Sequence, residues 1–399
     1  MSLFGASAIA RTLPATVAVQ AVVAMGTFAL SVLAPQLGVD VRALGFLGSA
    51  LFGIGALSSL ATGWLIRRFG DLPLAAMCMA AVLLAMLCLA ARAWMAEPGQ
   101  LGLSAVSLWS AVVLLGLAFG PETPACASVL ARVTPPARRP WVFSVRQTGN
   151  QIGAMAGSLA LPLLLVQHAA LPFLLVACTA LAVGLWCLRL VTSDGGAPAL
   201  ATSPGDTSGL RELLRAPALR LLTLTLVVFM ATQVCLNFFV MSHAVRHWQL
   251  PVPQAAGWVA LMQGAGLIGR LLWGRVAQRP GVDTARLLGG LGLLIGGAGL
   301  VLFLWPGTPP PAALAVLFVL VGISASGWNG VMVAEIARIA GPARAGAVMG
   351  AALMFGYAGL AIAPIAFAAA GTAWSTSTAY AGLLLATGLM GSRLVLRRP

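Results

Sequence analysis

The segment "ARVTPPAR" (residues 131–138) has a close counterpart in "ARIAGPAR" (residues 337–344), 206 positions further along the chain (337 minus 131). A second pair of related segments lies earlier in each half: "GWLIRRFG" (63–70) and "GRVAQRPG" (274–281). Each of the four follows a long apolar run and contains arginine. The same kinds of loop recurring in the same order indicate a duplicated unit, as in transporters built from two equivalent halves.

The composition requires a membrane environment. Of the 399 residues, 60% are hydrophobic and 8% are charged, and the mean hydropathy is +0.98. A soluble protein cannot hide that much apolar surface from water, so lipid must supply most of the surroundings. The basic residues are arginines in short loops, without the interleaved aromatic residues of a nucleic-acid-binding patch, and we expect no nucleic acid partner.

Twelve segments are long enough to cross a bilayer, which requires about 20 mostly apolar residues. Their expected limits are 12–37, 44–66, 72–94, 103–131, 140–167, 170–190, 217–245, 254–277, 285–305, 311–339, 344–370 and 376–395. Most are joined by a few residues, as antiparallel neighbouring helices require. We therefore predict an all-α polytopic membrane protein whose twelve transmembrane helices form two pseudo-symmetric six-helix bundles.

One connection is longer than the others and divides the chain. The stretch "VTSDGGAPALATSPGDTSG" (191–209) is rich in Ser, Gly, Pro and Ala, a composition typical of flexible linkers. It predicts an N-terminal six-helix bundle over 1–190, a cytoplasmic linker over 191–216 and a C-terminal six-helix bundle over 217–399.

The arginines predict the orientation. With the N-terminus inside, eighteen of the 23 basic residues fall on the inner side and three, Arg42, Arg92 and Arg246, fall on the outer side. Short cytoplasmic loops carry an excess of Lys and Arg, so both termini are expected in the cytoplasm.

The chain resembles the major facilitator superfamily over essentially its whole length. The motif of that family between spans 2 and 3 is G-x-L-x-D-R-x-G-R-R, and the chain matches it at Gly63, Arg68 and Gly70, and at Leu65. It departs from the motif at two positions, where Arg67 replaces the acidic residue and Asp71 a basic one. The resemblance implies that these residues help to latch the two halves on the inner side.

The second half carries a weaker copy of the same motif. The chain keeps Gly274, Arg279 and Gly281, with Arg275 beside them, and has Gln278 at the acidic position. Three further stretches, "GPETPA" (120–125), "FSVRQTG" (143–149) and "GWNGVMVAEIAR" (327–338), are similar to a subset of bacterial members. The resemblance implies a secondary transporter in a bacterial inner membrane.

Charged residues at membrane depth need partners or a wet cavity, and two clearly qualify. Glu122 lies ten residues before Arg132, and Arg146 lies seven residues after Arg139, which gives depths of about 15 and 10 Å at 1.5 Å per residue. The two side chains are therefore close enough to pair across a helical hairpin. Two interpretations remain open: a permanent structural ion pair, or a pair that a substrate opens.

The second interpretation follows from the chemistry of the partners. Arginine stays charged and can hold an anion, whereas a glutamate away from water can exchange a proton. A substrate carboxylate that displaces Glu122 from Arg146 would link anion binding to proton binding. Polar neighbours on the same segment, Gln147 and Asn150, are further candidates for substrate binding.

Three glycines follow in that segment, Gly149, Gly153 and Gly157, and their spacing predicts close helix packing. In the second half, Trp328 and Asn329 lie in mid-span between glycines. A ring beside an amide is suited to holding a small ligand, and a tryptophan in a helix interface is the equal alternative.

Near the inner end of the same span, Glu335 and Arg338 are one turn apart, close to the arginines of the second motif copy. This arrangement predicts a gate network rather than a substrate site. His243 and His247 have i,i+4 spacing but no accompanying acidic or cysteine ligand, so we expect no metal site. The six cysteines lie inside apolar runs and predict neither disulfides nor a metal site.

No catalytic motif of the H-E-x-x-H, Walker or G-x-S-x-G type occurs, so we predict no enzyme and no cofactor. The preferred function is proton-coupled uptake of a small organic anion by alternating access, in a monomer. Proton-coupled efflux of hydrophobic drug-like compounds is the alternative within transport. A transporter-like membrane sensor without flux is the alternative of another class.

Overall fold

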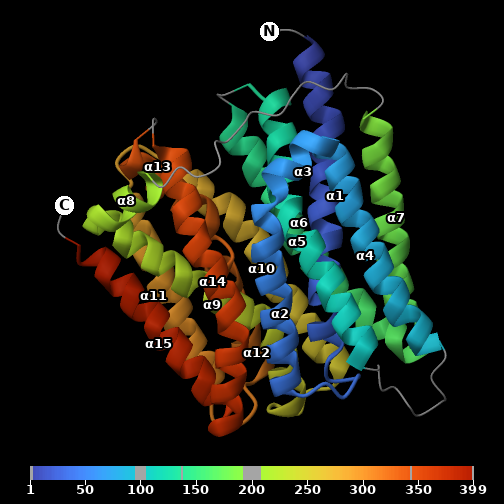
Figure 1. Cartoon of the computed structure of the whole chain (residues 1–399). Coiled ribbons are helices and arrows are strands. Elements are labelled where there is room, and N and C mark those ends of the chain that lie inside the picture. Colours follow the sequence, from blue (N-terminus) through green and yellow to red (C-terminus); the bar gives the residue numbers. More distant parts are fainter. Residues whose placement is uncertain (1–2, 95–104, 136–137, 192–207, 342–343, 398–399) are drawn as a thin grey trace. The chain divides into compact units, whose positions relative to one another are not determined.

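The computed structural model describes residues 3–94, 105–135, 138–191, 208–341 and 344–397. Within these residues the chain forms helices and no strand (Figure 1). Contacts divide it into two compact units: unit 1 comprises residues 1–40 and 50–202, and unit 2 comprises residues 41–49 and 203–399. The predicted linker falls mostly on residues 192–207, outside the described residues, and the predicted domain limits stay a prediction.

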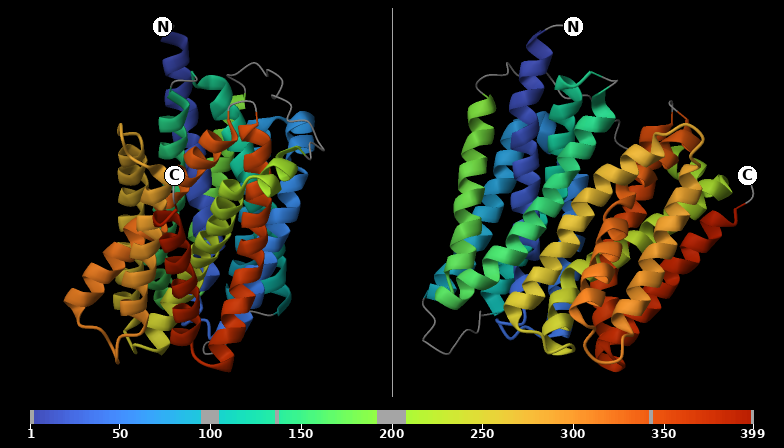
Figure 2. Two further views of the ribbon diagram at one scale, coloured as in Figure 1. Left: turned by 90° about the vertical axis from the view of Figure 1, so that its left-hand side faces the viewer. Right: turned by 180° about the vertical axis from the view of Figure 1, so that it is seen from behind.

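Unit 1 is a bundle of long helices that run side by side (Figures 1 and 2). Its helices are α1 (Leu3–Leu33), α3 (Thr62–Phe69), α4 (Asp71–Trp94), α5 (Ala105–Val133), α6 (Arg139–Gln167) and α7 (Leu171–Val191). Helix α2 (Val41–Leu60) is shared, because its first nine residues belong to unit 2 and the rest to unit 1.

Unit 2 repeats the helical arrangement of unit 1. Its helices are α8 (Ser208–Arg215), α9 (Pro217–Arg246), α10 (Val252–Ala277), α11 (Thr284–Phe303), α12 (Pro311–Ala325), α13 (Trp328–Ala340), α14 (Ala345–Ala373) and α15 (Thr376–Val395). In unit 1, α1 packs on α6, and α4 on α5 and α7; in unit 2, α9 packs on α14, and α11 on α12 and α15. The pseudo-symmetry predicted from the repeated loops is thereby confirmed.

Each of the twelve predicted spans corresponds to one helix or to two consecutive helices. Eleven spans in the described residues are long and apolar enough to cross a membrane. The twelfth predicted span is α15, whose ends carry polar residues such as Thr376, Ser377 and Arg393. The chain is therefore a multi-pass all-α membrane protein, as the hydropathy predicted.

Two predicted spans are broken, and near each break serine hydroxyls bond to backbone carbonyls of their own helix. Near the end of α2, the Ser58 hydroxyl donates to Gly55 O (3.1 Å) and the Ser59 hydroxyl to Ala56 O (2.7 Å). Near the end of α12, the Ser324 hydroxyl donates to Leu320 O (2.6 Å). Such bonds offer the backbone an alternative to the regular helix. The breaks fall in spans 2 and 10, which are not equivalent in the duplication.

Glycines allow close approach where α6 packs on α1. A Cβ atom on Gly153 would lie 1.9 Å from the carbonyl oxygen of Ala21, and one on Gly149 would lie 2.5 Å from that of Val17. Only glycine permits these distances, so the small-residue stripe of α6 sets its separation from α1. This packing holds the N-terminal half of α6, which carries Arg146, beside α1.

Candidate functional site

The polar centre of unit 1 is an ion pair between α5 and α6. The Arg146 guanidinium donates from Nη2 to Glu122 Oε1 at 2.5 Å, and the two side chains are 1% and 3% exposed. The hydroxyl of Thr123 donates to Glu122 Oε2 at 2.7 Å. The pairing expected from the two depths is confirmed. Both charges are out of water, so each charged side chain needs the other as its counter-ion.

The local sequence explains why Glu122 sits there. Pro121 and Pro124 lie within α5, and each removes one backbone N–H donor from the helix. On the same helix, a Cβ atom on Gly120 would lie 2.1 Å from the carbonyl oxygen of Gly55 in α2. Close packing on α2 therefore holds this irregular part of α5 in place, and the Glu122 carboxylate with it.

Two amide pairs involve residues of α6, the helix that carries Arg146. Gln20 of α1 donates from Nε2 to Gln147 Oε1 of α6 at 2.9 Å. On α6, Asn150 donates from Nδ2 to Gln151 Oε1 at 3.2 Å, and Gln151 is completely buried. The predicted residues Gln147 and Asn150 are half-buried, on the same helix as Arg146. Unit 1 thus gathers three of the five predicted substrate residues.

Sequence reasoning missed Gln20, although a signal was present. Thr12, Thr16 and Gln20 occur at every fourth position of α1, and all three are buried. Residues four apart share one helix face. A polar stripe of this spacing in an apolar span predicts a helix face directed toward other polar groups.

The polar centre of unit 2 contains two pairs of neutral amides. Asn329 of α13 donates from Nδ2 to Gln233 Oε1 of α9 at 3.3 Å. Gln263 of α10 donates from Nε2 to Asn237 Oδ1 of α9 at 2.9 Å. Sequence reasoning missed Gln233, Asn237 and Gln263. The i,i+4 spacing of two amides on α9 is the signal that could have found them.

Trp328 lies beside Asn329 but is turned into the interior of unit 2. It is 1% exposed, and its ring meets that of Phe229 edge to face at a centroid distance of 5.5 Å. Its Nε1–H donates to Ala325 O at 2.9 Å. This geometry favours the helix-interface alternative. A role for Trp328 in ligand binding stays a prediction.

At the break between α12 and α13, side chains donate hydrogen bonds to backbone carbonyls. The Trp273 indole of α10 donates to Ile323 O at 2.9 Å, and Asn329 Nδ2 lies 3.3 Å from Ser326 O. Together with the Trp328 bond, these contacts satisfy carbonyls that the interrupted helix leaves free. Side-chain hydrogen bonds therefore stabilise the break between α12 and α13.

The first copy of the loop motif closes α3 and opens α4. Gly70 ends α3 with a positive φ of 92°, which glycine adopts without strain, and Arg67 and Arg68 in the last turn are exposed. Asp71 begins α4, is buried, and forms an ion pair with Arg132 at the end of α5. Asp71 therefore pairs with the segment "ARVTPPAR" (131–138), which contains Arg132.

The second copy has an equivalent construction. Gly281 has a φ of 83°, and Asp283 caps α11 by accepting bonds from the backbone N–H groups of Ala285 and Arg286. Gly274 lies in the last turn of α10, and Arg275 and Arg279 are exposed near its end.

Glu335 is the buried acid at this end of unit 2. Arg338 donates to its two oxygens at 2.8 and 2.7 Å, and the Thr284 hydroxyl donates to Oε2. These side chains line a hollow of about 570 Å³, with Asp283 and Arg397 also in its wall. The interactions place Glu335 and Arg338 next to the second motif copy; their role as a gate stays a prediction.

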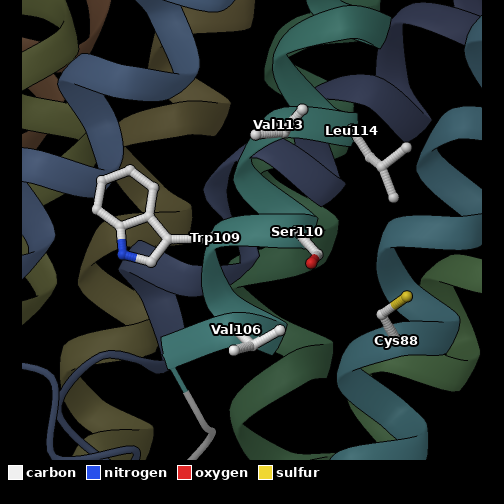
Figure 3. Close-up of a pocket in the computed structure, with 6 residues that line it drawn as sticks. All are labelled: Cys88, Val106, Trp109, Ser110, Val113 and Leu114. Carbon is white, nitrogen blue, oxygen red and sulfur yellow. The ribbon is translucent and has the colours of Figure 1, made fainter.

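A second hollow, of about 770 Å³, lies on unit 1 between α4 and α5 (Figure 3). In Figure 3, Ser110 and Leu114 of α5 point toward Cys88 of α4, and Trp109 extends to the other side. Val106 and Val113 complete the lining, which contains no charged side chain and none of the predicted site residues. It offers nothing that would hold an anion.

His243, near the end of α9, and His247, directly after that helix, contact each other and other protein groups. His243 is buried, with Nδ1 at 2.9 Å from the Thr376 hydroxyl, and its ring stacks on that of His247 at 4.6 Å. Among the described residues, no group of three or more His, Cys, Asp or Glu side chains could hold a metal ion.

Comparison with known proteins assigns the family. A sequence model of the family described as Major Facilitator Superfamily matches residues 13–364, which is most of the chain. The chain belongs to the major facilitator superfamily. It is therefore a membrane transporter and not an enzyme. No curated protein matches the sequence.

Solved transporters of the superfamily fold are similar over nearly the whole chain. A peptide transporter POT in complex with sulfate has a TM-score of 0.74 and 16% identity, covering 99% of this chain and 98% of that one. The nucleoside transporter NupG has a TM-score of 0.74 and 13% identity, covering 97% and 99%. A bacterial homologue of the human lysosomal transporter Spinster has a TM-score of 0.69 and 16% identity, covering 98% and 95%. At these identities the likeness shows the fold alone.

Proposed function

We propose that this transporter takes up a small organic anion together with protons, by alternating access. The observation that carries the proposal is the buried ion pair of Arg146 and Glu122. Arginine cannot lose its proton in a protein, so Arg146 is a permanent site for a carboxylate. Glu122 can change its charge, and its cationic partner within the described residues is that same arginine.

The two roles are linked through competition. A substrate carboxylate that binds Arg146 takes the counter-charge away from Glu122. An unpaired carboxylate out of water is unfavourable, so Glu122 then takes up a proton. Substrate and proton binding support each other, which is the requirement for symport. Gln147 and Asn150 beside the pair, and Asn329 in unit 2, are proposed to bind other polar groups of the substrate.

Uptake into proteoliposomes across a panel of carboxylates tests this proposal. With a pH gradient directed inward, the wild type is expected to accumulate at least one carboxylate. In Glu122→Gln, the amide keeps the shape and still accepts a hydrogen bond from Arg146. This variant is expected to exchange substrate across the membrane without responding to the gradient.

Glu212→Gln is a matched control, because Glu212 lies in the short helix α8 and pairs with Arg344 outside the α5–α6 site. It should respond to the gradient like the wild type. Uptake by Glu122→Gln that follows the gradient as strongly as in the wild type contradicts the coupling role. Extrusion of hydrophobic compounds with no carboxylate transport supports drug efflux, and the absence of any flux supports a sensor.

We further propose that the protein is a monomer in a bacterial inner membrane, with both termini in the cytoplasm. The excess of arginine in the loops assigned to one side supports this orientation.

The proposed substrate class has a parallel in a structural neighbour. One of these neighbours is a POT family transporter solved with 5-aminolevulinic acid, so in that protein the fold holds a small acid.

A further inference from the structure

Helix α8 (Ser208–Arg215) lies immediately before the first span of unit 2. A single residue, Ala216, separates it from α9, whose span covers Pro217–Arg246. Ala216 has extended backbone angles (φ −88°, ψ 111°), so the chain changes direction between the two helices. A helix that ends one residue before a span begins lies at the level of the membrane surface.

One side of α8 is fastened to the body of unit 2. Leu213 is 3% exposed and is covered where α8 packs on α14 and α9. The Glu212 carboxylate accepts a hydrogen bond from Arg344 Nη1 at 2.7 Å, at the start of α14. Glu212 is the one acidic residue of this helix, and the ion pair neutralises it.

The opposite side of α8 remains open. Arg211, Leu214 and Arg215 are exposed, and Leu214 is 54% exposed. Positions i, i+3 and i+4 lie on one side of a helix, so the leucine and the two arginines are exposed on the same side of α8. We call these three residues the outer face of α8. Arg220, in the first turn of α9, is also exposed and adds a positive charge close by.

We propose that the outer face of α8 docks on the anionic phospholipid headgroups of the leaflet at the arginine-rich side of the membrane. Guanidinium groups bind phosphate through two hydrogen bonds, and a leucine exposed on the same side of the helix can insert among the acyl chains. Negatively charged lipid attracts basic residues next to a span. A soluble anion would use the arginines but not the exposed leucine. The proposal does not depend on the identity of the substrate.

Hydrogen–deuterium exchange of the full chain in lipid nanodiscs tests the proposal. One preparation contains phosphatidylcholine alone, and the other contains phosphatidylcholine mixed with phosphatidylglycerol. The backbone amides of residues 210–215 are expected to exchange at least about tenfold more slowly with the anionic lipid, since each arginine contributes about fivefold. About 0.5 M salt should remove most of the difference, because it screens charges at the membrane surface.

The double variant Arg211→Gln/Arg215→Gln is expected to lose this protection, and Leu214→Ser to weaken it. Glutamine is also a good helix former, so α8 itself should persist. A matched control, Arg286→Gln/Arg393→Gln, removes two exposed arginines of unit 2 outside α8 and should keep the lipid effect.

Three results overturn the proposal. In the first, the wild type exchanges equally fast in both lipids. In the second, inorganic phosphate added to the phosphatidylcholine nanodiscs protects residues 210–215 as well as the anionic lipid does. In the third, the control variant loses as much protection as the α8 variant. The salt dependence of the wild type alone decides the question if the α8 variant does not fold.

Discussion

The polar centres of the two units differ in the groups that pair within them, although the helices around them are arranged alike. Unit 1 holds a buried cation and a buried anion, Arg146 and Glu122, which pair with each other. Unit 2 holds buried and half-buried amides, joined as Gln263–Asn237 and Asn329–Gln233. The duplication therefore preserved the helix packing but not the chemistry.

This difference suits the two polar centres to different roles in transport. An ion pair responds to protons and to competing anions, because its members depend on each other's charge. Amides stay neutral over the whole physiological range and offer donors and acceptors of fixed type. Unit 1 is thus suited to coupling, and unit 2 to hydrogen bonding. The broken span 10 adds to the contrast, since its equivalent in unit 1, α5, is continuous.

The largest expected effect comes from breaking the ion pair on one side. Arg146→Met leaves Glu122 buried without its partner and should lower the free energy of unfolding by about 3–5 kcal/mol. The double variant Arg146→Met/Glu122→Leu should recover most of this loss, because no charge remains buried. Unfolding of the purified protein by titration with SDS measures both values. A double variant as unstable as the single one contradicts the pairing.

Close helix contacts are what the two units share, and matched glycines test this. A Cβ atom on Gly153 would lie 1.9 Å from Ala21 O, and one on Gly269 would lie 2.1 Å from Ile323 O. Either Gly→Ala substitution should cost about 1–3 kcal/mol through overpacking. Gly290 has no atom within 4 Å of the added Cβ, so Gly290→Ala should be neutral or stabilising. Thermal unfolding of the three variants decides; equal stability of all three refutes the close packing.

The amides of unit 2 should show a cost that is independent of charge. Gln263→Leu leaves the buried Asn237 without its partner and should lower the free energy of unfolding by about 1–3 kcal/mol. The double variant Gln263→Leu/Asn237→Leu should be nearly neutral in the same SDS titration. If the double variant loses twice as much as the single one, the amides act separately and not as a pair.

The smallest effect is expected at the broken span. Trp273→Phe keeps a ring but removes the N–H that donates to Ile323 O, and should cost about 1 kcal/mol. Amide exchange near residues 323–329 should become faster in this variant. Trp109→Phe, which changes an exposed indole of unit 1, is the control and should leave that region unchanged. Unaltered exchange in Trp273→Phe means that the indole does not hold the break together.

Hydropathy and loop motifs predicted most of the fold. Each expected span has its helix, and the Arg146–Glu122 pair follows from counting residues between loops. The partners Gln20 and Gln233 could not be found in this way, because depth says nothing about the direction in which a side chain points. The breaks in spans 2 and 10 also went unpredicted, because hydropathy is continuous across both and the contacts at the breaks, such as Ser58 with Gly116 and Trp273 with Ile323, join residues far apart in the chain.

The sequence by itself determined which segments cross the membrane, how often, and which charges lie at membrane depth. These properties depend on the composition of contiguous segments. A run of about 20 apolar residues can cross the bilayer whatever the rotation of the helix about its axis. Only the tertiary structure decided the partners. The rotation of each helix about its axis depends on contacts such as Gly153 with Ala21 and Gly120 with Gly55, which lie far apart in the chain. That rotation directs Arg146 toward Glu122, and the ring of Trp328 into the interior of unit 2.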